Sequence, residues 1–351
     1  MKHVTSAFCL TVGLIAAISF SMPVHAKGDL AGYDRFDVTA AHRSMPLAAS
    51  IWYPAGTRIY SAPVNKGPIW KTTMAYIGAA IAPGKHPLVL LSHGSGGNMD
   101  AIGWLSSELA LRGAMVVAVN HPGTTSGDSS PRRTSYIGQR SADITATLDQ
   151  LLANPEFAPY IDTDQIAVAG FSLGGSTVLN LAGLRFDRDL YRQYCDRFGD
   201  TVQDCAFLRR GGVKFDQFPD DLSANSKDPR IQKFIVIEPG MTDAVDPDSI
   251  KDVDGDFLFI RLGREHGWRA SDVEATGSNL LAKLDHPEYA VFAPANHLTF
   301  LGECVPGVAE MLAQMDDDPI CSDPAGTDRG LIHAQIIDEI SGFLSLKPKS
   351  D

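Results

Sequence analysis

Residues 165–175 read Gln-Ile-Ala-Val-Ala-Gly-Phe-Ser-Leu-Gly-Gly and decide the fold. The apolar run 166–169 has the small and β-branched side chains of a central parallel strand that is covered on both faces. It ends at a G-x-S-x-G turn, which joins a strand to a helix and exposes its serine. Ser172 could instead be an ordinary helix N-cap. The strand before it and the helical run 176–181 after it favour a nucleophile.

Length and composition indicate a globular protein. The 351 residues suffice for one large α/β domain with insertions or for two modest domains. Hydrophobic residues make up 44% of the chain and charged residues 21%, which is ordinary for a globular protein. The formal net charge of −12, without a basic stripe, argues against binding to nucleic acid or to an anionic membrane.

The first 26 residues have the features of an export signal. Lys2 supplies a positive start, residues 7–20 form a short apolar core, and Val24-His25-Ala26 is an acceptable cleavage site. We expect 1–26 to be a signal peptide and 27–351 to be the exported chain, periplasmic or secreted. The alternative is a transmembrane anchor, for which the apolar core is short. No later stretch approaches spanning length, so no stable membrane insertion is expected.

Four cysteines remain after the signal: Cys195, Cys205, Cys304 and Cys321. An even number in an exported chain indicates disulfides, and four cysteines allow three pairings. Pairing each cysteine with its neighbour in sequence closes two short loops. A zinc site is the alternative, but the chain has no C-x-x-C or H-E-x-x-H motif. No metal and no cofactor are therefore expected.

Apolar runs of strand length alternate with helical patterns, which predicts a doubly wound, mostly parallel sheet. We expect strands at 33–39, 46–52, 87–91, 114–119, 166–169, 234–237, 257–262 and 289–292, and helices at 100–112, 142–153 and 328–344, besides the one after Ser172. Residues 55–85 lack clear periodicity and are interpreted as a long excursion. Residues 185–228 are either a cap or a disordered insertion. Their aromatic residues and cysteines favour an ordered, helical cap within one domain, 27–351.

A serine nucleophile needs a base within reach, and the base needs a carboxylate that orients it. In sheets that carry this turn, the order along the chain is serine, acid, histidine, and the site lies at the carboxyl ends of the strands. His297 follows the last expected strand and fits this order. His93 and His121 also follow strands, but they precede Ser172, so we expect them to structure loops.

Two carboxylates are candidates for the acid. Glu238 ends the strand after the serine unit, and Glu265 lies just past the next strand. Either position can serve, with Asp272 a remote third. We favour Glu238 and keep Glu265 as the alternative, since either could be a surface carboxylate or part of a loop ion pair.

The tetrahedral intermediate needs two backbone N–H donors for its oxyanion. One is the residue after the nucleophile, Leu173. The other is expected from the glycine-rich loop 92–98, at Ser95. The acidic run 243–256 does not have the glycine and glutamate spacing of an EF-hand, so a solvated loop is expected there instead of a calcium site.

The sequence resembles the secreted serine α/β-hydrolases known as predicted dienelactone hydrolases, which are similar to platelet-activating-factor acetylhydrolase. The resemblance is carried by Trp52-Tyr53-Pro54, Ser92-His93-Gly94-Ser95-Gly96, Asn120-His121, Gly170-Phe171-Ser172-Leu173-Gly174-Gly175, His297-Leu298-Thr299-Phe300-Leu301, Cys321-Ser322-Asp323, Asp328-Arg329 and His333. It implies an α/β-hydrolase fold, Ser172 as nucleophile, His297 as base, and Ser95 and Leu173 as oxyanion donors. The acid position matches Glu238, although aspartate is usual there. Dienelactone hydrolase itself uses cysteine, and Ser172 departs from that pattern.

These features together predict an exported serine carboxylesterase. It would cleave small-molecule esters, most readily those with short acyl chains, through an acyl-enzyme, with the cap shaping the acyl pocket. A lactone or polyester hydrolase would use the same triad. A binding protein that keeps the hydrolase fold without its chemistry is the alternative from another class.

Overall fold

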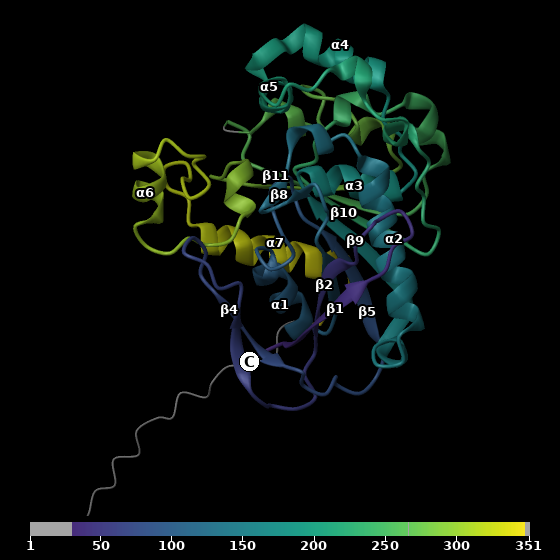
Figure 1. The fold of residues 1–351 in the computed structure, drawn as a ribbon, viewed down its shortest axis with the longest axis vertical. Helices are drawn as coiled ribbons and strands as arrows, with labels where there is room; N and C mark the ends of the chain where they lie inside the picture. The colour runs from purple at the N-terminus through teal and green to yellow at the C-terminus, as the bar shows by residue number, and fades with distance from the viewer. Residues whose placement is uncertain (1–29, 266, 348–351) are drawn as a thin grey trace, which may run out of the picture.

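A ten-stranded sheet forms the centre of the computed structural model, which describes residues 30–265 and 267–347 (Figure 1). From edge to edge its strands are β12 (Glu288–Phe292), β11 (Asp256–Leu262), β10 (Lys233–Ile237), β9 (Ile161–Phe171), β5 (His86–Ser92), β6 (Met115–Val119), β2 (Leu47–Tyr53), β1 (Gly32–Val38), β4 (Thr73–Ile77) and β3 (Ser61–Val64). Neighbours from β12 to β6 are parallel, while β2 is antiparallel to both β6 and β1. The expected doubly wound, mostly parallel sheet is confirmed.

Helices cover both faces of the sheet. The principal ones are α1 (Gly103–Leu111) and α7 (Arg329–Phe343) on one face, and α2 (Ile137–Ala153) and α3 (Leu173–Leu181) on the other. Leu88 and Leu90 of β5 join the hydrophobic core beneath α2 and α3, whereas Val89 and Leu91 join the core beneath α1 and α7. The alternation of side chains along a strand thus fills two separate cores.

Residues 55–85 were expected to be a long excursion from the sheet, but they contribute two strands to it. β4 pairs with β1 in parallel, and β3 pairs with β4 in antiparallel register at the edge of the sheet. Pro63 lies in β3, and an edge strand tolerates a residue without an N–H donor. Both strands are short and partly exposed, so their sequences show little periodicity and the pattern does not reveal them.

Smaller elements occupy the loops. They are the hairpin strands β7 (Thr124–Thr125) and β8 (Asp128–Ser129), and the helix α6 (Val308–Gln314). α2 begins five residues before the expected 142. The described residues contain no helix that is both long and apolar enough to cross a bilayer. The expected signal peptide, 1–26, lies outside the described residues.

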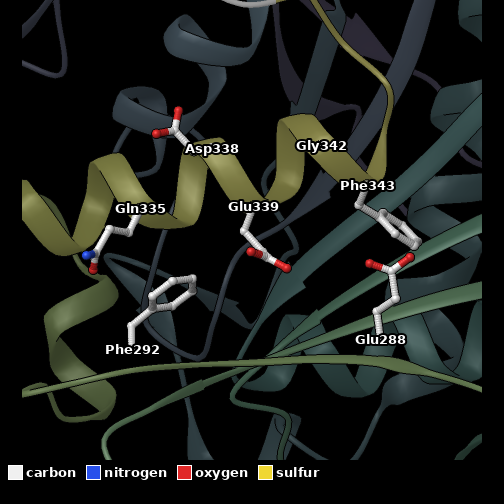
Figure 2. A pocket seen from close by; sticks show the side chains of 7 residues that line it. All are labelled: Glu288, Phe292, Gln335, Asp338, Glu339, Gly342 and Phe343. Carbon is white, nitrogen blue, oxygen red and sulfur yellow. The ribbon is translucent and has the colours of Figure 1, made fainter.

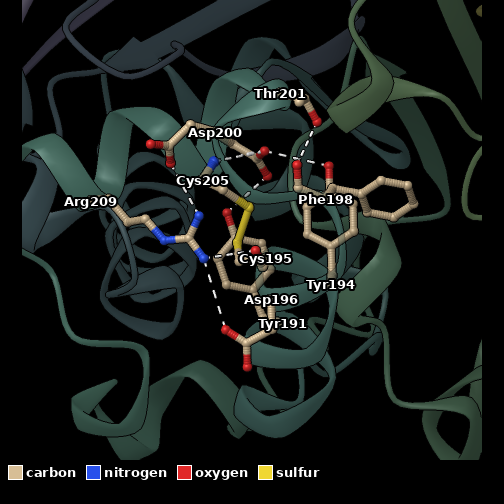
Figure 3. Close-up of a disulfide and its surroundings, with 10 residues drawn as sticks. Tyr191, Tyr194, Cys195, Asp196, Phe198, Asp200, Thr201, Cys205 and Arg209 are labelled. Atoms are coloured by element: carbon tan, nitrogen blue, oxygen red, sulfur yellow. Dashed lines mark hydrogen bonds and ion pairs between the residues drawn. A yellow bond between two sulfur atoms is a disulfide. The ribbon is translucent and has the colours of Figure 1, made fainter.

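Residues 185–228 are ordered and helical. They form α4 (Arg188–Phe198) and α5 (Gln203–Arg210), which lie above α3 at the top of Figure 1. A disulfide between Cys195 and Cys205 joins the two helices (Figure 3). The Arg209 guanidinium lies across it, donating to the Cys195 carbonyl at 2.7 Å and contacting Asp200 at 3.1 Å.

The second disulfide joins Cys304 to Cys321, so both bonds connect cysteines that are neighbours in sequence. Of the three possible pairings, the local one is the pairing found. Among the described residues, no group of three or more histidine, cysteine or acidic side chains could hold a metal ion.

The junction of β9 and α3 is tightly packed. Ser172 has φ 55° and ψ −117°, a backbone conformation that residues other than glycine rarely adopt. A Cβ atom at Gly170 would lie 2.2 Å from the Gly174 carbonyl oxygen, and one at Gly174 would lie 2.0 Å from the Ser92 carbonyl oxygen. Gly170 therefore allows the turn to close on itself, and Gly174 allows it to contact the end of β5.

A buried histidine supports the loop that carries His297. His333 of α7 donates from Nε2 to the Thr299 carbonyl oxygen at 2.9 Å, and its ring stacks on Trp104 of α1 at 3.8 Å. Thr299 belongs to the 3-10 helix η10 (His297–Phe300). Burial lowers the pKa of His333 to about 4, so this side chain is neutral at pH 7.

We expect Gly174→Ala to lower the free energy of unfolding by about 3 kcal/mol or more, because the new methyl group collides with backbone. Gly342→Ala in α7 is the matched control, since a Cβ there meets nothing within 4 Å. It should change stability by less than about 1 kcal/mol, in the stabilising direction. Urea unfolding measures both, and equal stabilities would contradict the packing described.

We also expect stability to fall as the pH is lowered from about 6.5 to about 4. In that window the unfolded chain protonates His333, whereas the folded chain does not, so lowering the pH favours unfolding. The contribution is of the order of 3 kcal/mol. Urea unfolding at several pH values should give a flatter dependence for His333→Gln. The exposed His286 provides the control, and an effect of His286→Gln as large as that of His333→Gln would refute the assignment.

Candidate active site

Ser172, His297 and Glu238 form a hydrogen-bonded chain. His297 Nε2 lies 3.1 Å from Ser172 Oγ, and His297 Nδ1 lies 3.0 Å from Glu238 Oε2. An ionised carboxylate only accepts hydrogen bonds, so Nδ1 is the donor and Nε2 is left to accept from the serine hydroxyl. This arrangement can take a proton from Ser172.

Parallel strands of the sheet bring these three residues together: β9 and β10 are neighbours, and β12 lies on the far side of β11. Ser172 follows β9, Glu238 follows β10, and His297 begins η10 in the loop after β12. The parallel strands end at the same edge, where such sheets carry their sites. Asn296 holds the start of η10, because its side chain accepts hydrogen bonds from the backbone N–H groups of Leu298 and Thr299.

The Glu238 carboxylate is buried and fully engaged. Its Oε1 accepts from the Leu262 backbone N–H at 2.7 Å, and its Oε2 accepts from Ser271 Oγ at 2.7 Å in addition to His297. These donors fix the orientation of the carboxylate. Glu238 also has a positive φ of 48°, the second strained residue of the site.

The other two carboxylates considered lie elsewhere. Glu265 is exposed in the turn after β11. Asp272 forms an ion pair with Arg261 at 3.2 Å. Among the hydrogen bonds of the described residues, none joins Glu265 or Asp272 to His297. The structure therefore brings Glu238, and not its alternatives, to the imidazole.

Two residues that contact His297 and Glu238 do not belong to any sequence motif. Trp268 stacks on the His297 ring with 3.9 Å between centroids and 12° between planes, and Ser271 donates to Glu238. Both lie in or next to the 3-10 helix η8 (Arg269–Ser271). An aromatic residue in a polar loop, at Trp268, is the one hint that the sequence offers.

Arg269 joins this segment to the 185–228 insertion. Its guanidinium makes two hydrogen bonds of 2.9 Å to Asp243, and it lies over the rings of Tyr194 and Phe198 at 5.6 and 4.9 Å. The expectation of a solvated loop at 243–256 is wrong at its start, where Asp243 is paired and the next two residues are buried. Packing against the insertion explains the difference.

The glycine-rich loop lies against the nucleophile. A Cβ at Gly94 would be 3.2 Å from Ser172 Cβ, so only the backbone fits there. Ser95 is exposed at the tip of the turn, and the Gly96 N–H donates to the Thr124 carbonyl at 2.9 Å. Leu173 is the first residue of α3. Both segments expected to supply oxyanion donors are thus next to Ser172.

His121 takes part in a second serine, histidine and carboxylate arrangement. Its Nε2 lies 3.0 Å from Ser92 Oγ, and its Nδ1 lies 2.9 Å from Asp143 Oδ2. Burial lowers the pKa of His121 to about 4, so the ring is neutral at pH 7. All three side chains are buried, which leaves no access for a substrate. This geometry accords with a loop-structuring role.

His93 is also buried, and burial holds its pKa well below the usual range. Its Nδ1 donates to the Gly94 carbonyl at 2.7 Å, within the glycine-rich loop. Arg140 lies beside both histidines and is 2% exposed. Burial lowers the pKa of Arg140 to about 9, and the neighbouring Asp143 opposes that shift. The guanidinium remains charged at pH 7.

A cavity of about 450 Å³ lies apart from these residues, between β12 and α7 (Figure 2). It is lined by Glu288, Phe292, Gln335, Asp338, Glu339, Gly342 and Phe343. None of the candidate site residues lines it.

Comparisons with known proteins agree with this fold. Residues 88–329 match the model of the alpha/beta hydrolase family. A ferulic acid esterase from Streptomyces cinnamoneus superimposes with a TM-score of 0.58 at 17% identity, covering 93% of this chain and 91% of that one. A dienelactone hydrolase from Anabaena variabilis gives 0.45 at 15% identity, covering 82% and 95%. The curated proteins include no match. The matched residues make up well over half of the chain, and the protein belongs to the alpha/beta hydrolase family.

Proposed function

We propose that this protein is a serine carboxylesterase that cleaves small-molecule esters through an acyl-enzyme. The observation that carries the proposal is the hydrogen-bonded chain from Ser172 through His297 to Glu238 at the carboxyl ends of the parallel strands. Family membership supports a hydrolase, and the strained turn at Ser172 has the form of a nucleophile elbow.

In the acylation step, Ser172 Oγ attacks the ester carbonyl while its proton passes to His297 Nε2. Glu238 stabilises the imidazolium through Nδ1 and holds the ring in the required tautomer. The carbonyl oxygen becomes an oxyanion, for which we propose the backbone N–H groups of Leu173 and Ser95 as donors. Collapse of the intermediate breaks the ester C–O bond, and His297 returns its proton to the leaving alcohol.

In the deacylation step, water attacks the acyl-serine and gives its proton to His297. The second tetrahedral intermediate releases the carboxylic acid, and the proton returns to Ser172. Trp268 keeps the imidazole plane fixed through both steps by stacking on it. In both steps His297 is the group that accepts the proton and then returns it.

We further propose that the 185–228 insertion bounds the acyl pocket. Arg269 ties this insertion to the segment that carries Trp268, next to His297. Short acyl chains are the proposed substrates. Export is part of the proposal as well, because the two disulfides suit an oxidising compartment.

We expect Ser172→Ala and His297→Ala each to lower kcat for p-nitrophenyl acetate by about 10⁴-fold or more, because each removes a member of the triad. Glu238→Gln should lower kcat by about 10⁴-fold, since an amide favours the wrong tautomer. The exposed Glu265→Gln is the matched control and should retain wild-type turnover. Steady-state kinetics with acetate, butyrate and octanoate esters measure these effects and size the acyl pocket.

Two outcomes would contradict the proposal. Turnover that survives in Ser172→Ala would exclude this serine as the nucleophile. A folded wild-type chain that hydrolyses none of the three esters and resists a fluorophosphonate probe would indicate a binding protein on the hydrolase fold.

A further inference from the structure

One buried guanidinium is linked by hydrogen bonds to both segments that carry the proposed oxyanion donors. We infer that Arg140 is a positioning residue: it sets the spacing between the loop of Ser95 and the turn of Leu173, and so holds the two oxyanion donors in register. This inference rests on the proposed function, because it concerns how that site stabilises its tetrahedral intermediate.

The first link runs from Arg140 to the loop. One terminal nitrogen donates to Ser92 Oγ at 3.1 Å and also to the His93 carbonyl oxygen. Ser92 ends β5, and Ser95 follows three residues later. His93 in turn donates from Nδ1 to the Gly94 carbonyl at 2.7 Å. The guanidinium therefore fixes the backbone from which the Ser95 N–H projects.

The second link runs to the turn at the nucleophile. Arg140 Nε donates to Thr177 Oγ1 at 3.0 Å. The Thr177 hydroxyl passes the connection on by donating to the Leu173 carbonyl oxygen at 3.1 Å. Leu173 is the residue whose N–H is the other proposed donor. The planar guanidinium thus joins the two halves of the oxyanion site through one intervening hydroxyl.

Burial makes this connection rigid. Arg140 lies on α2 and is buried against the end of β5 and α3. Its remaining terminal nitrogen donates to Thr124 Oγ1. Asp143, one turn along α2, supplies the compensating negative charge and is itself held by Arg43 and His121. A guanidinium with this many partners has a single orientation.

A positioning role differs measurably from a purely structural one. A purely structural residue supports the whole fold, so its loss lowers thermal stability and affects catalysis only through the fraction of unfolded protein. A residue that spaces the oxyanion donors acts on the tetrahedral state, so its loss lowers kcat and leaves KM unchanged.

Thr177 is the point at which the link can be cut without leaving a gap at Arg140. Thr177→Val removes the hydroxyl and keeps the shape, and Thr177→Ser restores the hydroxyl. Thr147→Val is the matched control, because buried Thr147 makes the same type of bond to the carbonyl four residues before it, Asp143, at 2.7 Å. Ser92→Ala removes one of the two hydrogen bonds from Arg140 to the loop and leaves the one to the His93 carbonyl, and it serves as a second variant if Thr177→Val does not fold.

The experiment measures kcat and KM for p-nitrophenyl acetate, melting temperature, and inhibition by phenylboronic acid in the full chain. The boron atom accepts the Ser172 oxygen while the proton passes to His297, which leaves a tetrahedral adduct that resembles the intermediate. We expect Thr177→Val to lower kcat about tenfold to 100-fold with KM unchanged, since loss of one oxyanion donor costs about 10²–10³. Ser92→Ala should lower kcat by a smaller factor, because the bond to the His93 carbonyl remains. In each variant boronate affinity should fall by the same factor as kcat. Thr177→Ser and Thr147→Val should resemble the wild type.

Equal kcat and boronate affinity in the wild type, Thr177→Val and Ser92→Ala would overturn the inference. So would losses that follow melting temperature alone and occur equally in Thr147→Val. Ser172→Ala separates the two proposals. Turnover that persists in Ser172→Ala overturns the proposed function, whereas turnover lost there but unchanged in Thr177→Val and Ser92→Ala overturns the role of Arg140 only.

Discussion

The contact between the turn at Ser172 and the end of β5 constrains the whole site. A Cβ at Gly174 would lie 2.0 Å from the Ser92 carbonyl oxygen, so a methyl group cannot enter there, and one at Gly94 would lie 3.2 Å from Ser172 Cβ, which is a tight contact. The proposed nucleophile and the loop that begins at Ser92 are therefore packed directly against each other. The strained φ of Ser172 persists because β9, α3 and this contact all enforce it. The sheet brings the remaining groups to the same edge, so the chemistry depends on a packing constraint that only glycine satisfies.

Charge in this region is arranged in two separate layers. Above the strand ends, Glu238 is held by Leu262 and Ser271 and faces His297. Beneath the loop of Ser95, Arg140 and Asp143 are both buried, and the two neutral histidines His93 and His121 lie beside them. The upper layer holds the groups that we propose transfer protons, whereas the lower layer donates hydrogen bonds to the loop backbone. Neutral histidines suit the lower layer, because a second positive charge next to Arg140 would be costly in a buried setting.

The sequence predicts the sheet, its order of strands and helices, and the three residues that the structure joins at the strand ends. These depend on local patterns: an apolar run that ends at G-x-S-x-G, and polar residues just past later strands. The edge strand β3 and its neighbour β4 were not predicted because both are short and partly exposed. Ser271, Trp268 and the link from Thr177 to Arg140 were not predicted because they join distant parts of the chain. Arg140 was not predicted because α2 begins at Ile137, before the expected start at 142, which places Arg140 inside the helix.

Trapping of the acyl-enzyme would identify the residue that attacks the ester. Wild-type protein is mixed rapidly with p-nitrophenyl acetate, quenched in acid, and analysed by intact-mass measurement followed by peptide mapping. If Ser172 is the nucleophile, we expect one acetyl group per chain, located on Ser172 and absent from Ser172→Ala. An acetyl group on another residue would contradict the proposed role of Ser172. So would turnover that persists in Ser172→Ala.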